Sequence, residues 1–222
     1  MIYPMYVPKW FRSLFHGIMW NSEETGSVVH LTFDDGPIPE VTPWVLNLLD
    51  EYNQKATFFC VGENVNKYPE IYSEIISRGH TVGNHTFHHL NGWKVKGKKY
   101  LADISKADVD INSNLFRPPY GKLTFGLYRK LKNQKKIVMW TFLSGDFEKS
   151  FNADLCFVKV QQHSVDGAIL VFHDSIKAKH SLQKILPQIL AYYREKNILS
   201  KAIQQNYSPL ILYMLLSAFE RI

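Results

Sequence analysis

The sequence predicts an α/β protein, a distorted (β/α) barrel of about seven parallel strands. Short apolar runs rich in β-branched and aromatic residues alternate along the chain with longer segments of helical periodicity. This alternation is the pattern of βαβ units, and nearly continuous apolar strands are typical of a sheet covered by helices. The 222 residues, 45% of them hydrophobic, are enough for one such barrel, so a single domain over residues 1–222 is expected.

The individual elements follow from apolar runs and from helix-ending residues. Apolar runs predict strands at 27–33, 56–62, 80–85, 115–121, 135–142 and 167–175. Helical periodicity predicts helices at 42–52, 68–79, 98–111, 124–132, 152–164 and 181–196. Thr42 is expected to cap the first of these helices, with Pro43 in its first turn. Pro69 opens the second helix and Gly79 closes it.

Both ends of the chain are apolar, and helical extensions are expected at 1–27 and 200–222. Residues 9–20 predict a helix with an apolar face formed by Trp10, Phe11, Leu14, Phe15, Ile18 and Met19. Packing of this face on its own domain is favoured, and contact with a membrane surface is the alternative. The apolar run 209–219 is shorter than the ~20 residues of a membrane-spanning helix. It predicts a buried terminal helix, with a membrane or partner contact as the alternative.

Charge and cysteine content limit the classes of partner. The net charge of +6 favours a lysine-rich solvated surface, with an anionic partner as the alternative. No DNA- or RNA-binding motif is present, so a nucleic-acid partner is not expected. Cys60 and Cys156 are far apart and form no CxxC motif, so a metal or redox role is not expected, and Cys60 is predicted to be a small core residue. No secretory signal is recognisable, which favours a cytoplasmic or membrane-peripheral location, and the oligomeric state stays open.

Reactive side chains follow four of the predicted strands. They lie in the segments FDDGP, GNHTFHH, FRPPYG and VFHDS, which in a parallel barrel meet at one rim. Asp34 and Asp35 repel each other at the end of a buried strand, so a bound cation is expected to compensate them. His85 and His89 are four residues apart and can face one ion. Two imidazoles with one carboxylate, from Asp34 or Asp35, make a common zinc site.

Five short motifs in order carry a resemblance to a known family. They are TFDDGP at 32–37, HTFHH at 85–89, RPPYG at 117–121, WTFLSGDF at 140–147 and LVFHD at 170–174. With these motifs the chain resembles the NodB-type polysaccharide deacetylases, carbohydrate esterase family 4. The resemblance covers residues 28 to 193 and implies a single catalytic domain of the NodB type.

The resemblance implies a metal site and a general base. Asp35, His85 and His89 would hold a divalent metal. Zinc suits two imidazoles and a carboxylate best, and cobalt or nickel is the alternative. Asp34 would be the base that takes a proton from the attacking water, and Arg117 would pair with Asp34 and orient it.

The resemblance also implies an acid and substrate contacts. His173 would protonate the leaving amine, with Asp146 as its partner. Tyr120 would offer its backbone N–H to the developing oxyanion. Leu170 would line the pocket for the acyl methyl group, and Pro119 would lie beside the substrate.

The fourth motif departs from the family pattern. Family members often carry Asp where this chain has Leu143, and Trp where it has Phe147. These departures leave the substrate groove on that side open. Trp93 is either a platform on which a sugar stacks or a core residue. His88 is expected to be a packing or surface residue.

Three functions are compatible with these residues. The leading hypothesis is a metal-dependent hydrolase that removes the N-acetyl group from N-acetylglucosamine-type residues of a glycan. A deformylase or deacylase of a lipid-linked sugar at the membrane is the second. A noncatalytic carbohydrate-binding protein is the third, although the retained base, acid and metal ligands argue against it.

Overall fold

The computed structural model describes residues 6–13, 15 and 17–205. The strands of the described residues are β1 (Ile18–Met19), β2 (Val28–Asp34), β3 (Ala56–Cys60), β4 (Thr81–Asn84), β5 (Leu115–Phe116), β6 (Lys136–Val138), β7 (Phe142–Leu143), β8 (Ala168–His173) and β9 (Leu199–Ser200). The helices are α1 (Lys9–Arg12), α2 (Thr42–Glu51), α3 (Gly62–Lys67), α4 (Pro69–Ser77), α5 (Gly97–Ala107), α6 (Phe125–Leu131), α7 (Ala153–His163) and α8 (Lys179–Lys196). A 3₁₀ turn, η1, spans Pro119–Gly121.

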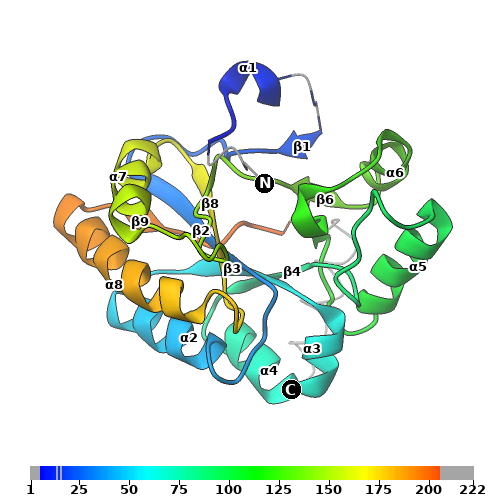
Figure 1. Ribbon diagram of the computed structural model, residues 1–222, viewed down its shortest axis with the longest axis horizontal. Helices are drawn as coiled ribbons and strands as arrows, with labels where there is room; N and C mark the ends of the chain where they lie inside the picture. The colour runs from blue at the N-terminus through cyan, green and yellow to red at the C-terminus, as the bar shows by residue number, and fades with distance from the viewer. Residues whose placement is uncertain (1–5, 14, 16, 206–222) are drawn as a thin grey trace, which may run out of the picture.

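The strands form one curled parallel sheet in the order β1-β6-β5-β4-β3-β2-β8-β7, and β9 pairs with β2. All pairings between these strands are parallel. The helices cover the outer face of the curled sheet, with α2, α7 and α8 around β2, β3 and β8 and with α5 and α6 around β5 and β6 (Figure 1). The predicted parallel α/β barrel is confirmed. Among the described residues the sheet has nine strands rather than the expected seven or so. The additional strands arise because β1, β7 and β9 are two-residue segments without a sequence pattern of their own.

The two faces of the central strands have different roles. Leu31 and Phe33 of β2 point toward the covering helices, where Phe33 stacks on Phe58 with ring centroids 5.1 Å apart. Thr32 and Asp34, one residue out of phase, point to the inside of the curl, where both bind the same buried arginine. Because successive side chains in a strand alternate between faces, one strand supplies both the core and the site.

The N-terminal prediction is wrong over most of residues 9–20. The helix ends at Arg12, Gly17 has a left-handed backbone (φ 88°), and Ile18 begins β1, which pairs with β6. The predicted apolar face does not form, since Trp10 is 68% exposed; Leu14 lies outside the described residues. A glycine in the left-handed region ends helical periodicity, and the free edge of β6 offers backbone partners to the residues that follow.

The predicted strand 135–142 is two separate strands. Between β6 and β7, the carbonyl oxygens of Val138 and Met139 accept hydrogen bonds from the guanidinium of Arg117 (3.3 and 3.1 Å). Carbonyls that bind a buried side chain are not available to a neighbouring strand, so the chain changes partner at this point.

Other local predictions also need correction. Thr42 is the first residue of α2 rather than its cap, because its hydroxyl donates to Asp174 (2.6 Å) and accepts from the Ile38 N–H (2.8 Å). Helix α3 was not predicted. Residues 200–205 form no helix, contrary to the expectation for 200–222, and the apolar run 209–219 lies outside the described residues.

The structure describes the surroundings of both cysteines and the length and apolarity of the helices. Cys60 is buried in the core, as predicted, and Cys156 is a second buried free thiol. Among the described helices, none has the length and apolarity needed to cross a bilayer.

Candidate active site

The carboxyl-terminal ends of four strands converge on one cavity. Strands β2, β4, β5 and β8 are followed by the segments that carry the predicted site residues, and β2 pairs with β8 so that Asp34 lies beside His173. The cavity has a volume of about 240 Å³. Its lining includes Asp34, Asp35, His85, His89, Tyr120 and His173 from the predicted set.

Asp35, His85 and His89 form a cluster with the geometry of a metal site. One ligand atom of each lies within 4.8 Å of the others. The Asp35 carboxylate is 3.2 Å from Nε2 of His89 and 3.8 Å from Nε2 of His85. The backbones of Asp35 and His89 are left-handed (φ 83° and 52°), which turns these side chains toward each other. The donor set of two nitrogens and one oxygen fits a divalent cation such as Zn²⁺.

Hydrogen bonding and burial prepare the cluster for a cation. Nδ1 of His85 lies 2.8 Å from the carbonyl oxygen of Arg117, which leaves Nε2 as the ligand atom. Burial lowers the pKa of His85 to about 4, so the ring is neutral, as a metal ligand must be. Burial raises the pKa of Asp35, but the hydrogen bond to His89 and the nearby histidines outweigh it and hold that pKa well below its ordinary value.

Asp34 belongs to a different interaction, an ion pair with Arg117. The Asp34 carboxylate accepts a hydrogen bond from the Arg117 guanidinium at 2.7 Å. Arg117 is fully buried, also donates to the Thr32 hydroxyl (2.7 Å), and lies 4.0 Å from the centroid of the Phe59 ring. The other Asp34 oxygen is 4.0 Å from Nε2 of His85. The structure thus separates the two adjacent aspartates, one with the histidines and one with the arginine.

His173 and Asp146 form a second charged pair, with His173 on β8 beside Asp34 of β2. Nδ1 of His173 lies 2.7 Å from one Asp146 oxygen, and the His173 backbone N–H donates to the other oxygen at 2.8 Å. Burial lowers the pKa of His173, but the adjacent Asp146 carboxylate outweighs this and raises the pKa to about 9. His173 is therefore charged at neutral pH, and its Nε2–H is the proton that it can transfer.

Tyr120 lies at the mouth of the cavity in a left-handed conformation (φ 60°). Its half-exposed ring lies 4.6 Å from the ring of His89. Gly121 follows with φ 63°, and a Cβ there would lie 2.6 Å from the Trp140 ring, so only glycine fits this approach. The role predicted for the Tyr120 backbone N–H stays a prediction.

Two residues predicted to contact the substrate, Leu170 and Pro119, do not line the cavity. Leu170 is fully buried in the core between the sheet and the helices, whereas Val171 lines the cavity. Alternation along β8 explains this, because residue 171 shares the inner face with His173 and residue 170 does not. Pro119 is buried in η1, and Pro118 lines the cavity in its place.

Trp93 is neither a core residue nor part of the cavity wall. It is 62% exposed, and the ammonium group of Lys122 lies 4.0 Å from the centroid of its ring. Gly92 brings this loop against the chain at Lys122, where a Cβ would lie 2.4 Å from the carbonyl oxygen. Its predicted role as a sugar platform is untested.

Two buried aspartates that support the site were not predicted. Asp103 accepts hydrogen bonds from the backbone N–H groups of Phe87 and His88 (3.0 Å each) and pairs with the His88 ring, which holds the loop between His85 and His89. Asp174 accepts from the Gly36 N–H (3.1 Å) and the Thr42 hydroxyl. The position of Asp174 next to His173 was the one available signal; Asp103 lies inside a helical pattern and offered none.

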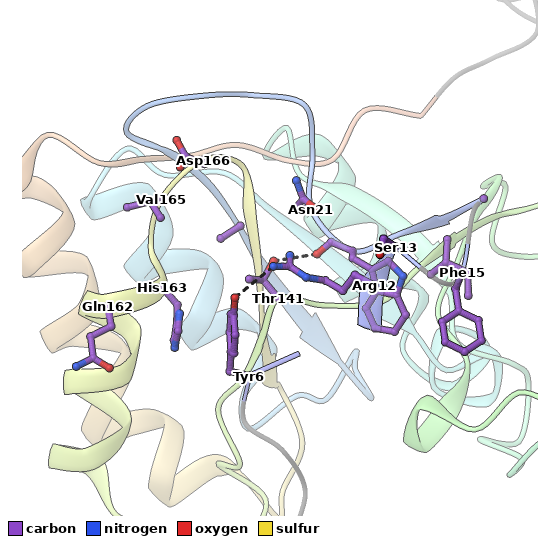
Figure 2. Close-up of a pocket in the computed structure, with 14 residues that line it drawn as sticks. Tyr6, Arg12, Ser13, Phe15, Asn21, Thr141, Gln162, His163, Val165 and Asp166 are labelled. Atoms are coloured by element: carbon purple, nitrogen blue, oxygen red, sulfur yellow. Dashed lines mark hydrogen bonds between the residues drawn. The ribbon is translucent and has the colours of Figure 1, made fainter. Parts of the chain in front are cut away.

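A larger cavity of about 600 Å³ lies at the opposite, amino-terminal end of the strands. It lies between the N-terminal segment and the start of β8 at Ala168. Figure 2 shows Arg12 in its interior beside Tyr6, whose ring stacks on His163 at 4.3 Å. None of the predicted site residues lines this cavity.

The sequence also matches a known protein family. The family model described as polysaccharide deacetylase matches residues 21–142, more than half of the chain. The protein therefore belongs to the polysaccharide deacetylase family, as the five motifs indicated.

Three similar proteins are each named for the glycan on which they act. A peptidoglycan-N-acetylglucosamine deacetylase of Bacillus cereus is 37% identical over 181 residues, covering 72% of this chain and 62% of the relative. A chitooligosaccharide deacetylase of Azorhizobium caulinodans is 32% identical over 156 residues, covering 67% of this chain and 74% of the relative. The crystal structure of the Bc1960 peptidoglycan N-acetylglucosamine deacetylase superposes with a TM-score of 0.75 at 30% identity, covering 89% of this chain and 95% of the other. The chain thus spans less than two thirds of the first of these relatives.

Proposed function

We propose that this protein is a divalent-metal-dependent hydrolase that removes the N-acetyl group from N-acetylglucosamine-type residues of a glycan, with peptidoglycan as the favoured polymer. The observation that carries the proposal is the separation of charges around one cavity. A carboxylate paired with Arg117 and an imidazolium held charged by Asp146 flank the three-residue cluster. Amide hydrolysis requires a base and an acid in one site. Relatives named for peptidoglycan support the choice of polymer.

The site residues have separate tasks in this reaction. Asp35, His85 and His89 would hold the divalent ion, which when bound would polarise the acetyl carbonyl and acidify the attacking water. Zinc is proposed for this donor set, with cobalt or nickel as the alternatives. Asp34 takes a proton from the water as the water oxygen bonds to the acetyl carbon. The Tyr120 backbone N–H stabilises the negative charge that develops on the carbonyl oxygen.

His173 acts on the leaving group in the last step of the reaction. As the C–N bond breaks, Nε2 of His173 donates its proton to the sugar nitrogen, so that a neutral amine leaves. The products are acetate and a free amino sugar. Asp34 and His173 then return to their starting protonation states by exchange with solvent.

The test measures acetate release from N-acetylglucosamine oligomers and from peptidoglycan fragments by the zinc-loaded protein. Asp34→Asn should lower kcat about a hundred- to ten-thousandfold, since it removes the base and keeps the shape of the side chain. Zinc content measured by atomic absorption should stay at the wild-type level. Asp110→Asn, which changes an exposed aspartate, is the matched control.

The remaining outcomes separate the alternatives. Equal activity of Asp34→Asn and Asp110→Asn would exclude Asp34 as the base. A folded, zinc-loaded wild-type protein that releases formate from lipid-linked formamido sugars, and no acetate, would establish the deformylase instead. Glycan binding without any release would establish a carbohydrate-binding protein.

A further inference from the structure

Lys177 is the one lysine or arginine among the described residues that line the active-site cavity. It lies in the loop between β8 and α8, four residues after His173, and its side chain is exposed. Its ammonium group lies 5.3 Å from the centroid of the Phe147 ring, and that ring contacts the His173 ring edge-on at 4.8 Å. The cation–π contact favours side-chain positions over the cavity.

The other charges of the site already have counter-charges. Asp34 is paired with Arg117, and His173 is paired with Asp146, at 2.7 Å in each case. The remaining carboxylate, Asp35, belongs to the cluster that fits a divalent cation. Lys177 makes no ion pair with any residue that the structure describes. Its positive charge is therefore available to a ligand in the cavity.

The position of Lys177 indicates which part of a substrate it meets. In the proposed reaction His173 protonates the sugar nitrogen, so the side chains around His173 face the sugar rather than the departing acetyl group. Lys177 and Phe147 lie on this side. An anion carried by the same sugar or by its neighbour in the glycan would complement the lysine.

We propose that Lys177 recognises a carboxylate of the glycan, so that the enzyme prefers acidic amino-sugar polymers to neutral ones. This inference rests on the proposed deacetylase function and narrows its substrate class. Muramic acid that bears no stem peptide has a free lactyl carboxylate and so the required chemistry, whereas a chitin-type oligomer does not.

The experiment compares one glycan with and without its negative charge. Soluble fragments of alternating N-acetylglucosamine and N-acetylmuramic acid are used with free carboxylates and after conversion of the carboxylates to amides. The readout is the ratio of kcat/KM for the acidic fragments to kcat/KM for the amidated fragments. Wild type should give a ratio above one, and Lys177→Met should lower it about two- to fivefold, the size expected for one solvent-screened ion pair.

Two further variants separate recognition from other effects. Lys177→Arg keeps the charge and should restore the ratio. Lys184→Met removes the same charge from an exposed position on α8 and should keep the wild-type ratio. In about 1 M salt, where the screening length falls to about 3 Å, the difference between wild type and Lys177→Met should shrink.

Each contrary outcome has its own meaning. If Lys177→Met leaves the ratio at the wild-type value, or if Lys184→Met lowers it equally, Lys177 does not recognise the carboxylate. A wild-type ratio of one or below overturns the preference for acidic glycans. If the wild-type protein releases acetate from no fragment at all, the proposed function itself fails, and this result is distinct from the other three.

Discussion

The two ends of the curled sheet hold cavities that differ in both size and chemistry. The cavity at the amino-terminal end is larger, about 600 Å³ against about 240 Å³. Yet the smaller one holds two buried ion pairs and the three-residue cluster. At the other end Arg12 is only half-buried and lies 3.4 Å from the Tyr6 hydroxyl, at the limit of hydrogen bonding. Volume alone therefore does not identify the site, whereas partnered buried charges do.

The difference has a physical origin in the parallel sheet. Each strand of the barrel ends at the rim that carries its following loop, and loops from distant parts of the sequence meet there. The amino-terminal cavity is instead closed by the N-terminal segment, which touches the sheet through isolated antiparallel bridges at Phe142 and Ala168. Substitutions at the two ends should accordingly differ greatly in effect.

The largest effect is expected for Arg117→Met. This change leaves Asp34 as a buried charge without its counter-charge, and two backbone carbonyls lose their donor. The free energy of unfolding should fall by about 3–5 kcal/mol, and deacetylation should be lost because Asp34 no longer has the partner that orients it. Urea denaturation measures the first quantity. Arg129→Met, at an exposed position on α6, is the control, and a similar stability for both variants would contradict this account.

A smaller but diagnostic effect is expected for Asp146→Asn. Asp146 is the group that raises the pKa of His173 to about 9, so wild-type kcat/KM should fall as the pH rises through that value and His173 loses its proton. Without the carboxylate, burial dominates and lowers the pKa. The alkaline limb should move to lower pH by about one to three units.

A pH profile of kcat/KM measures this shift. Asp154→Asn, which changes an exposed carboxylate on α7, should keep the wild-type limb. An alkaline limb that stays in place in Asp146→Asn would show that another group sets it.

The smallest effect is expected at the amino-terminal cavity. Arg12→Gln removes a charge with one long hydrogen bond. The free energy of unfolding should change by no more than about 0.5 kcal/mol, and kcat/KM by less than about twofold. Thermal unfolding and the acetate assay check both values. A large loss of activity in Arg12→Gln would show that the amino-terminal cavity also contributes to catalysis, contrary to this prediction.

Sequence patterns predicted the fold and the aspartates and histidines that line the cavity, because both depend on local features. Apolar runs define strands, and the carboxyl ends of parallel strands meet at one rim. The side chains of Asp35, His85 and His89 converge for this reason. Their catalytic and metal-binding roles remain predictions to be tested by the experiments above.

The failures are as informative as the successes. Residues 9–20 show helical periodicity, but Gly17 and the open edge of β6 turn Ile18 into a strand. Leu170 and Val171 are neighbours of the same chemical type, so composition did not distinguish the one that lines the cavity. Asp103 stabilises the histidine loop from within a helix whose pattern gave no sign of it.

The sequence by itself determined the order of strands and helices, and it identified the charged and histidine side chains that follow the strands. Only the tertiary structure decided which face of β8 lines the cavity and which lysine lies at its rim. These depend on strand register and on contacts between distant segments, such as Lys177 with the Phe147 ring. A local pattern cannot encode such contacts, because they form only when the barrel closes around them.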